Sequence, residues 1–310
     1  MPPSPPPLRT VPAEWVERAA AANLIYAAEP VNQPAPNFGN GYTATQWRSA
    51  AIYVAGLFSS SASGETRAAI PAPYLIDLAP PWRRTALAVD MELACIRALY
   101  TYADNSTMDS ATTQIEMRTY AHRANMHLLI TDFTVQTQGQ GTPSDFKDLQ
   151  FNLQFVDEFE PILENDGTGR PDVDLHRTPA ARVEAAASQT PRTEMQMRVD
   201  CFNGSTRTVE QVQKKGQIPP VVVSLCRTRP PPEGVMLLAG ESFTFTSALY
   251  TSLDFQFRSG DSSSPLQAAQ SAWTNASSQG GEALFHSHRQ AQEKLWTGRI
   301  EVADNHALVT

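Results

Sequence analysis

Histidines and carboxylates gather at two places in the sequence where they could hold a metal ion. The first is His286-Ser287-His288, a spacing that puts two imidazoles on the same side of a strand. The surrounding residues predict a helix instead, on which the two rings point roughly 200° apart. A closed zinc site needs four ligands, and no cysteine or third histidine lies nearby in the sequence. We therefore interpret the pair as helix histidines.

The second place is the acidic segment 157–176, which holds Asp157, Glu158, Glu160, Glu164, Asp166, Asp172 and Asp174 and ends at His176. Within it, residues 165–169 combine oxygen ligands with turn glycines, as a calcium loop does. The spacing departs from the EF-hand pattern, which ends on a glutamate at position twelve. A solvated acidic loop is the simpler interpretation, and a divalent-ion site is the alternative. We assign no metal ligand, cofactor or catalytic residue from either place.

Nucleophile motifs are equally sparse. Residues 144–147 spell SxxK, which begins a helix with a serine nucleophile in penicillin-recognising enzymes. No companion motif accompanies it, and Ser144 follows Pro143, so we predict a turn. Nucleophile elbows, phosphate loops, dinucleotide fingerprints, HExxH and paired CxxC motifs do not occur in the sequence. His122 and His127 lie five residues apart and are interpreted as structural. The sequence thus argues against the common enzyme families.

The first third of the chain has the apolar spacing of helices. Apolar residues recur at steps of three and four, which predicts helices over 14–28, 46–58, 82–103 and 110–129. The 82–103 segment has the clearest pattern, and it follows Pro80-Pro81, which suits a helix entry. The tryptophans of the chain, Trp15, Trp47, Trp82, Trp273 and Trp296, are all expected on helical faces, where they pack in the core.

After residue 129 the apolar period changes from 3.6 to 2, which indicates strands. Alternation predicts strands over 129–136, 149–156 and 194–202, and the apolar run Ile218–Phe257 predicts a meander with strands near 219–226, 234–239, 242–250 and 252–258. Two further helices are expected over 266–275 and 282–296. The predicted fold class is therefore α+β, with a helical N-terminal region, an antiparallel β-sandwich or jelly-roll-like central region, and short C-terminal helices.

These elements divide the chain into four expected parts. They are a Pro-rich arm at 1–12, a helical region at 13–128, a β domain at 129–260, and a C-terminal helical segment at 261–310 that packs on the helical region. The arm, with proline at positions 2, 3, 5, 6 and 7, favours an extended polyproline conformation.

Composition excludes several classes of protein. The 310 residues are 41% hydrophobic and only 18% charged, with a net charge of −8 and no run of Lys or Arg. A protein that coats nucleic acid presents a basic surface to phosphate, so direct genome coating is not expected. No apolar run is long enough to cross a membrane. Cys95, Cys201 and Cys226 are odd in number and widely spaced, which favours reduced thiols in the cytosol.

In layout the chain resembles outer-layer and coat proteins of double-stranded RNA viruses, some of which join a helical base to a jelly-roll head. The resemblance covers the order of elements over residues 12–298, and no residue motif carries it. It implies a structural capsid or capsid-associated subunit, in a virion assembled in the host cytoplasm. Its partners would be copies of itself and another shell protein. The low content of charged residues agrees with a life spent in contact with other subunits.

Two other functions remain open from the sequence. A metal-dependent hydrolase would use the acidic segment 157–176 together with His176. A glycan- or receptor-binding attachment module would use the loops of the β domain, and exposed aromatic residues on those loops would favour it.

Overall fold

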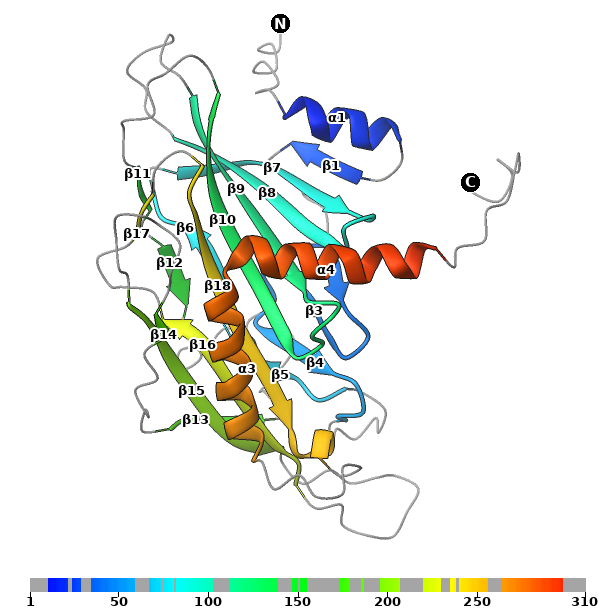
Figure 1. Cartoon of the computed structure of the whole chain (residues 1–310), viewed down its shortest axis with the longest axis vertical. Helices are drawn as coiled ribbons and strands as arrows, with labels where there is room; N and C mark the ends of the chain where they lie inside the picture. Colours follow the sequence, from blue (N-terminus) through cyan, green and yellow to red (C-terminus); the bar gives the residue numbers. More distant parts are fainter. Residues whose placement is uncertain are drawn as a thin grey trace, which may run out of the picture.

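A large antiparallel sheet, the main sheet, organises the chain (Figure 1). The computed structural model describes residues 11–21, 24–28, 35–58, 67–73, 75–80, 82–102, 112–138, 147–149, 151–154, 173–178, 185–186, 196–206, 220–229, 235–237, 240–255 and 264–297. Nine strands lie in the order β1-β7-β8-β9-β10-β18-β16-β15-β13, and β14 pairs with β15. Their bounds are β1 Leu24–Ala28, β7 Trp82–Asp90, β8 Cys95–Tyr102, β9 Thr112–Ala121, β10 Leu128–Gln138, β13 Val173–Arg177, β14 Ala185–Ala186, β15 Gln196–Thr206, β16 Val222–Arg229 and β18 Ser242–Thr251.

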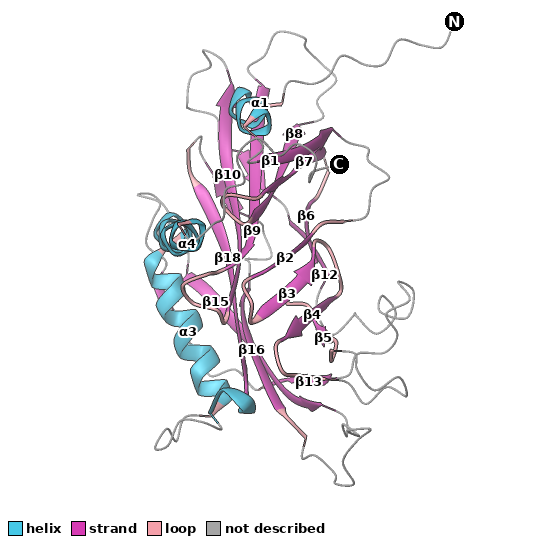
Figure 2. Cartoon of the chain, turned by 90° about the vertical axis from the view of Figure 1, so that its right-hand side faces the viewer, coloured by secondary structure: helices cyan, strands magenta, loops and turns pink. Residues whose placement is uncertain are grey.

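Shorter strands form a second layer against one face of the main sheet (Figure 2). A four-stranded sheet contains β2 Asn37–Gly39, β3 Thr43–Gln46, β4 Ala51–Val54 and β5 Ile70–Pro71. Two pairs complete the layer: β6 Leu75–Leu78 with β12 Phe151–Gln154, and β11 Lys147–Leu149 with β17 Val235–Leu237. The architecture is thus a β-sandwich of unequal layers.

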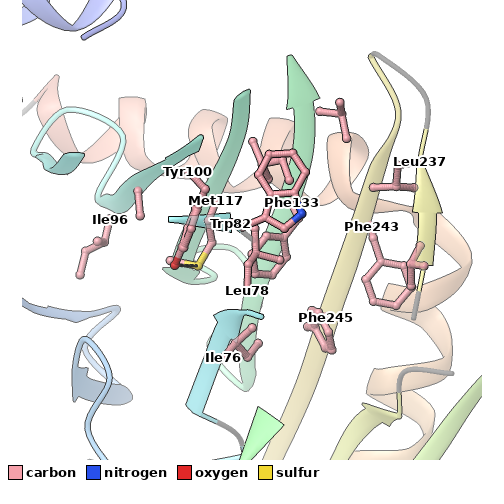
Figure 3. Packing of buried hydrophobic residues seen from close by; sticks show 14 of the residues in the cluster. Ile76, Leu78, Trp82, Ile96, Tyr100, Met117, Phe133, Leu237, Phe243 and Phe245 are labelled. Carbon is pink, nitrogen blue, oxygen red and sulfur yellow. Dashed lines mark hydrogen bonds between the residues drawn. The ribbon is translucent and has the colours of Figure 1, made fainter. Parts of the chain in front are cut away.

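The core between the two layers is apolar and rich in aromatic rings. Phe133 and Phe245 meet edge to face with their centroids 5.9 Å apart, and Tyr100 points its hydroxyl at the sulfur of Met117 (Figure 3). All four side chains are at most 1% exposed. Every second residue of the central strands points into this core, because successive side chains of a strand point to opposite faces of the sheet.

Helices cover the opposite face of the main sheet (Figure 2). They are α1 Ala13–Ala20 beside β1, α3 Pro265–Gln279 along β16 and β18, and α4 Gly281–Trp296, which crosses the sheet. Trp273 of α3 is fully buried and donates its indole N–H to the hydroxyl of Thr228, 3.1 Å away. At the start of α4, a Cβ on Gly281 would collide with the side chains of Thr244 and Asp132, so only glycine allows this approach.

The predicted helical region over 13–128 is wrong, and with it the α+β fold class. Within 13–128 the described helix is α1 alone, and the segments expected to be helices at 46–58, 82–103 and 110–129 contain strands β4, β7, β8 and β9. The misleading signal has a physical cause. Both faces of the main sheet are covered, so apolar residues occur on both sides of each strand and the alternation of period 2 is weakened. Alanine, a good helix former, is common in these strands, and packing overrides that propensity.

The strands expected after residue 129 are largely confirmed. The 129–136, 194–202, 219–226 and 242–250 segments match β10, β15, β16 and β18, and the expected C-terminal helices match α3 and α4. The segment 252–258 is different, because Ser252–Phe255 forms the 3-10 turn η2. The C-terminal helices were expected to pack on a helical region, whereas they pack on the main sheet. Strands from both sides of residue 128 join in that one sheet.

Further expectations concerned the cysteines, the Pro-rich arm and membrane-spanning segments. Cys201 and Cys226, which face each other on β15 and β16, form a disulfide, so the expectation of three reduced thiols is wrong; Cys95 is free and buried. Residues 1–10 of the Pro-rich arm lie outside the described residues. In the part of the chain that the structure describes, no helix is long and apolar enough to span a bilayer.

Candidate functional site

Four half-buried rings form a row at one end of the sandwich, which we call the aromatic row: Tyr42, His127, Tyr250 and Phe255. The His127 and Tyr250 rings stack with centroids 3.8 Å apart and planes 12° apart. Tyr42 meets His127 edge-on at 4.5 Å, and Phe255 lies 6.3 Å from Tyr250. The rings partly cover one another, and each of the four side chains stays partly exposed to solvent. Such groups combine apolar contact with hydrogen bonding.

Three rings of the aromatic row lie on separate turns of the fold, and the fourth, Tyr250, lies near the end of strand β18. Tyr42 lies between β2 and β3, His127 between β9 and β10, and Phe255 ends η2 after β18. Binding residues commonly lie on turns that a rigid scaffold positions. Here the scaffold is the pairing of β9, β10 and β18 in the main sheet.

Asn40 ties two of these turns together. Its side-chain carbonyl accepts hydrogen bonds from the backbone N–H groups of Tyr42 and Thr43, at 3.0 and 2.8 Å. Its amide group donates to the backbone carbonyls of His122 and Met126, at 3.0 and 2.9 Å. This one buried side chain therefore uses both acceptor and donor groups to hold the β2–β3 turn against the β9–β10 turn. Gly41, at φ +95°, supplies the left-handed step that the turn needs.

Backbone hydrogen bonds fix His127 against β18. Its Nδ1 lies 3.0 Å from the carbonyl oxygen of Leu249, and the N–H of Leu249 donates to the His127 carbonyl at 2.9 Å. Since a carbonyl only accepts, Nδ1 carries a proton and donates it to Leu249.

Asp254 supplies the carboxylate of the site. Its Oδ2 accepts from the hydroxyl of Tyr42 at 2.7 Å and from the N–H and hydroxyl of Thr251 at 2.7 and 3.0 Å. Its Oδ1 accepts no hydrogen bond from the described residues, and the side chain is half-buried. Burial raises the pKa of Tyr42, and the hydrogen bond to Asp254 raises it further. Tyr42 is therefore a phenol that donates to Asp254, and Oδ1 remains available to a ligand.

The chemistry that this arrangement supports is binding. The aromatic row carries a single carboxylate, whereas glycoside hydrolysis generally takes a pair that share the work of acid and base. Asp254 can accept hydrogen bonds from a ligand through Oδ1, and the partly exposed rings can contact the apolar parts of that ligand. Hydroxyl-rich molecules offer both kinds of group.

Charged side chains are also buried on the helix face of the main sheet, where their contacts indicate a structural role. Arg97 pairs through Nε with Glu116 and reaches Glu14 of α1 at 2.9 and 3.2 Å. Arg18 of α1 forms a two-pronged pair with Asp90, whose side chain is fully buried. The Arg97 hydrogen bond lowers the pKa of Glu14, whereas burial raises the pKa of Asp90. This ladder of ion pairs fastens α1 to the sheet and is enclosed by it.

His122 and His288, singled out in the sequence, lie together beneath α4 with ring centroids 5.8 Å apart. Each accepts a backbone N–H at Nδ1 and has Nε2 next to a backbone carbonyl: Asn125 and Leu284 for His122, Arg123 and Leu93 for His288. Both rings are therefore neutral and fully occupied. Burial lowers the pKa of both, that of His288 to about 4. Their role is to fasten α4, while His286, on the same helix, is exposed.

The other candidates from the sequence do not join the aromatic row. Ser144 and Lys147 contribute no described side chain, and residues 157–172 lie outside the described residues. His176 lies exposed on β13. No group of three or more His, Cys, Asp or Glu side chains that could hold a metal ion occurs within the described ranges. The divalent-ion site at 157–176 stays a prediction.

Sequence reasoning missed Tyr42, Tyr250, Phe255 and Asp254 altogether. They lie more than 200 positions apart in the chain at the extremes, and only the pairing of β9, β10 and β18 brings them together. The one local signal was the turn sequence Asn40-Gly41 directly before Tyr42, which is typical of a tight turn that displays the next residue.

Comparison with known proteins supports the fold alone. No family model matches the chain, and no curated protein matches its sequence. Among solved structures, the chain is similar to "Putative kojibiose phosphorylase from human microbiome", with a TM-score of 0.52 and 8% sequence identity. The match covers 88% of this chain and 38% of that protein, so this chain spans well under half of its length.

Proposed function

We propose that this chain is a glycan-binding β-sandwich domain that holds a mono- or oligosaccharide on the aromatic row. The observation that carries the proposal is the row itself, in which partly exposed rings lie beside a carboxylate whose Oδ1 accepts no hydrogen bond from the described residues. Sugars present C–H groups and hydroxyl donors side by side, and those are the two kinds of group that the row can contact.

The likeness to a protein named as a kojibiose phosphorylase supports the proposal from a different direction. This domain would correspond to less than half of that protein, and we infer that it binds a sugar. The role of a capsid or capsid-associated subunit and the metal-dependent hydrolase stay predictions, since neither the described residues nor the known structures test them.

Titration calorimetry of the full chain with a panel of mono- and disaccharides tests the proposal. A site of this size and polarity is expected to bind with a dissociation constant of about 1 mM, which is roughly −4 kcal/mol. Asp254→Asn and Tyr250→Ala should each weaken binding by about tenfold, the cost of a lost hydrogen bond or ring contact.

Phe58→Ala provides the matched control, because Phe58 is an aromatic residue 44% exposed at a different place, between β4 and β5. It should leave binding unchanged. Saturable binding that ignores Asp254→Asn and Tyr250→Ala would overturn the assignment of the site, and no binding across the panel would overturn the function. Sedimentation of the same sample tests the assembly hypothesis, which requires oligomers.

A further inference from the structure

A cavity of about 70 Å³ lies between the two layers of the sandwich, separate from the aromatic row. Strands β2–β4 and the segment before β6 form one wall, and β9 and β10 form the other. Its buried lining is mostly apolar, from Ile52, Met117 and Leu129. Gln46 and Arg48, which also line it, are exposed at the β3–β4 turn, so the cavity opens there. Ile76 and Met117 are visible in the neighbouring core (Figure 3).

Two hydroxyl groups interrupt the apolar wall of this cavity. Thr119 and Thr131 face each other across β9 and β10, and their Oγ1 atoms lie 3.1 Å apart. In that pair one hydroxyl donates to the other. The remaining O–H, on whichever threonine carries it, has no acceptor among the described residues; Thr131 is 8% exposed and Thr119 is half-buried. Buried hydroxyls normally find partners, so this proton calls for a ligand or water that accepts it.

At the opening, Arg48 holds a strained backbone. It has φ +59°, and it is the third residue of the turn closed by the hydrogen bond from Ser49 N–H to the Gln46 carbonyl at 3.0 Å. This turn position favours glycine or asparagine, because a side chain there crowds the backbone. An arginine therefore occupies a turn position that favours glycine. Strained residues cluster at ligand sites, so we take the strain as a sign that the guanidinium contacts a ligand.

The size and lining of the cavity limit the ligand. About 70 Å³ holds roughly five water-sized groups. The apolar wall disfavours a compact, multiply charged ion such as phosphate, which would lose its hydration there. A guanidinium at the opening matches a carboxylate in geometry and charge. The remaining threonine O–H needs an acceptor oxygen on the same ligand.

We propose that this interlayer cavity binds a short-chain hydroxycarboxylate, with its carboxylate at Arg48, its carbon chain between Ile52 and Leu129, and its hydroxyl at the Thr119–Thr131 pair. Lactate, which has six non-hydrogen atoms, is the probe of matching size. The site does not depend on the aromatic row, so it stands whether or not the chain binds glycans.

Titration calorimetry of the full chain with four probes tests each part of this arrangement. Lactate should bind saturably. Propionate, which lacks the hydroxyl, and 1,2-propanediol, which lacks the charge, should each bind at least about tenfold more weakly. Inorganic phosphate should not bind. Equal affinity for lactate and propanediol would mean that the carboxylate makes no contact with Arg48, which contradicts the proposed arrangement. Absence of lactate binding at about 50 mM would overturn the proposal.

Variants separate binding from folding. Arg48→Gly should abolish lactate binding while raising the unfolding temperature, because it relieves the positive φ. Ala94→Gly is the matched control: Ala94 has φ +47° in the β7–β8 turn, and its replacement should raise the unfolding temperature with binding unchanged. Thr131→Val, which keeps the shape, should reduce lactate affinity to that of propionate and leave propionate affinity as it was. Lactate binding retained by Arg48→Gly, or a lowered unfolding temperature, would refute the argument.

Discussion

The two faces of the main sheet bury the same strands in opposite ways. Toward the second layer, β8, β9, β10 and β18 present an apolar face, whose members are Ile96, Ala98, Tyr100, Met117, Phe133 and Phe245. Toward the helices, β7, β8, β9 and β10 present charged side chains at neighbouring positions, and we call this the charged face: Asp90, Arg97, Glu116, Arg118 and Asp132. Both faces are buried, so the difference lies in what covers them.

Coverage by helices makes the charged face possible. Helix α1 brings Glu14 and Arg18, and α4 brings Glu282, so that buried charges on the sheet meet opposite charges from the helices. The second layer brings apolar side chains, which have to interlock with those of the sheet. A truncated side chain on the apolar face should therefore destabilise the fold through lost packing. Removal of one charge from the charged face should destabilise it by leaving the partner ion unpaired.

The largest effect is expected at the centre of the apolar face. Phe133→Ala should lower the free energy of unfolding by about 4 kcal/mol, because it removes a fully buried ring and leaves a cavity. Urea denaturation measures the loss. Phe58→Ala, at a 44% exposed ring, should change stability by less than about 0.5 kcal/mol. A loss under about 1 kcal/mol for Phe133→Ala would mean that the two layers close around the missing ring.

On the charged face, Arg97→Met should cost about 3 kcal/mol, because it removes the cation that pairs with the buried carboxylate of Glu116, whereas Asp90 keeps its pair with Arg18. The diagnostic test is the double variant Arg97→Met with Glu116→Gln. Since it also removes the charge of Glu116, it should be more stable than Arg97→Met alone. Urea denaturation of the wild type, both single variants and the double variant measures this coupling. If the loss in the double variant equals the sum of the two single losses, the charges of Arg97 and Glu116 do not stabilise each other, and the side chains contribute only by packing.

Acid should loosen the helix cover. His288 is neutral in the folded chain, with a pKa of about 4, whereas an unfolded histidine titrates near 6.5. Between these values the unfolded chain binds more protons, so stability falls as pH falls, by about 2 kcal/mol from pH 8 to pH 5. Buried His122, which faces His288, has a lowered pKa and adds to the same trend, while Arg123 lies beside both.

Variants at two histidines of α4 test this origin by denaturation at several pH values. His288→Gln should be less stable than the wild type at pH 8 and should lose much of the dependence between pH 5 and pH 8. His286→Gln should keep the wild-type profile, because His286 is exposed on the same helix. The raised pKa values of Asp90 and Asp132 act in the opposite direction at lower pH, and the difference between the two variants cancels them. Equal slopes for both variants would contradict the assignment.

How much of this fold the sequence predicts depends on how each strand is covered. Strand β10, expected over 129–136, and β18, expected over 242–250, contain β-branched and aromatic residues and were found almost in place. Strand β8 is buried on both faces and β7 carries two alanines, so the apolar pattern of 82–103 imitates a helix of period 3.6. The charged face added to the confusion, because Arg97 and Asp132 are not residues that a core prediction includes.

The aromatic row could not be predicted from the sequence for a different reason. Tyr42 and Tyr250 become neighbours of His127 only when two turns and strand β18 meet, and no local spacing encodes that contact. The histidines that the sequence did single out, His122 and His288, proved to be fasteners of α4. The unpaired hydroxyl proton of the Thr119–Thr131 pair depends on strand register, which the sequence pattern fixes only to within a residue or two.

The smallest effect concerns the start of the helix cover, where local sequence and structure agree. Ser264 accepts a hydrogen bond from the N–H of Gln267, and the Gln267 side chain accepts from the N–H of Ser264, with Pro265 at the first helical position. Ser264→Ala should lower the free energy of unfolding by about 1 kcal/mol, because it leaves one end of α3 uncapped. Ser278→Ala, at an exposed position near the other end of the same helix, should be neutral within about 0.5 kcal/mol in the same urea titration. If Ser264→Ala and Ser278→Ala change the free energy of unfolding equally, the cap of α3 does not stabilise the fold, and the packing of Trp273 holds the helix on the sheet.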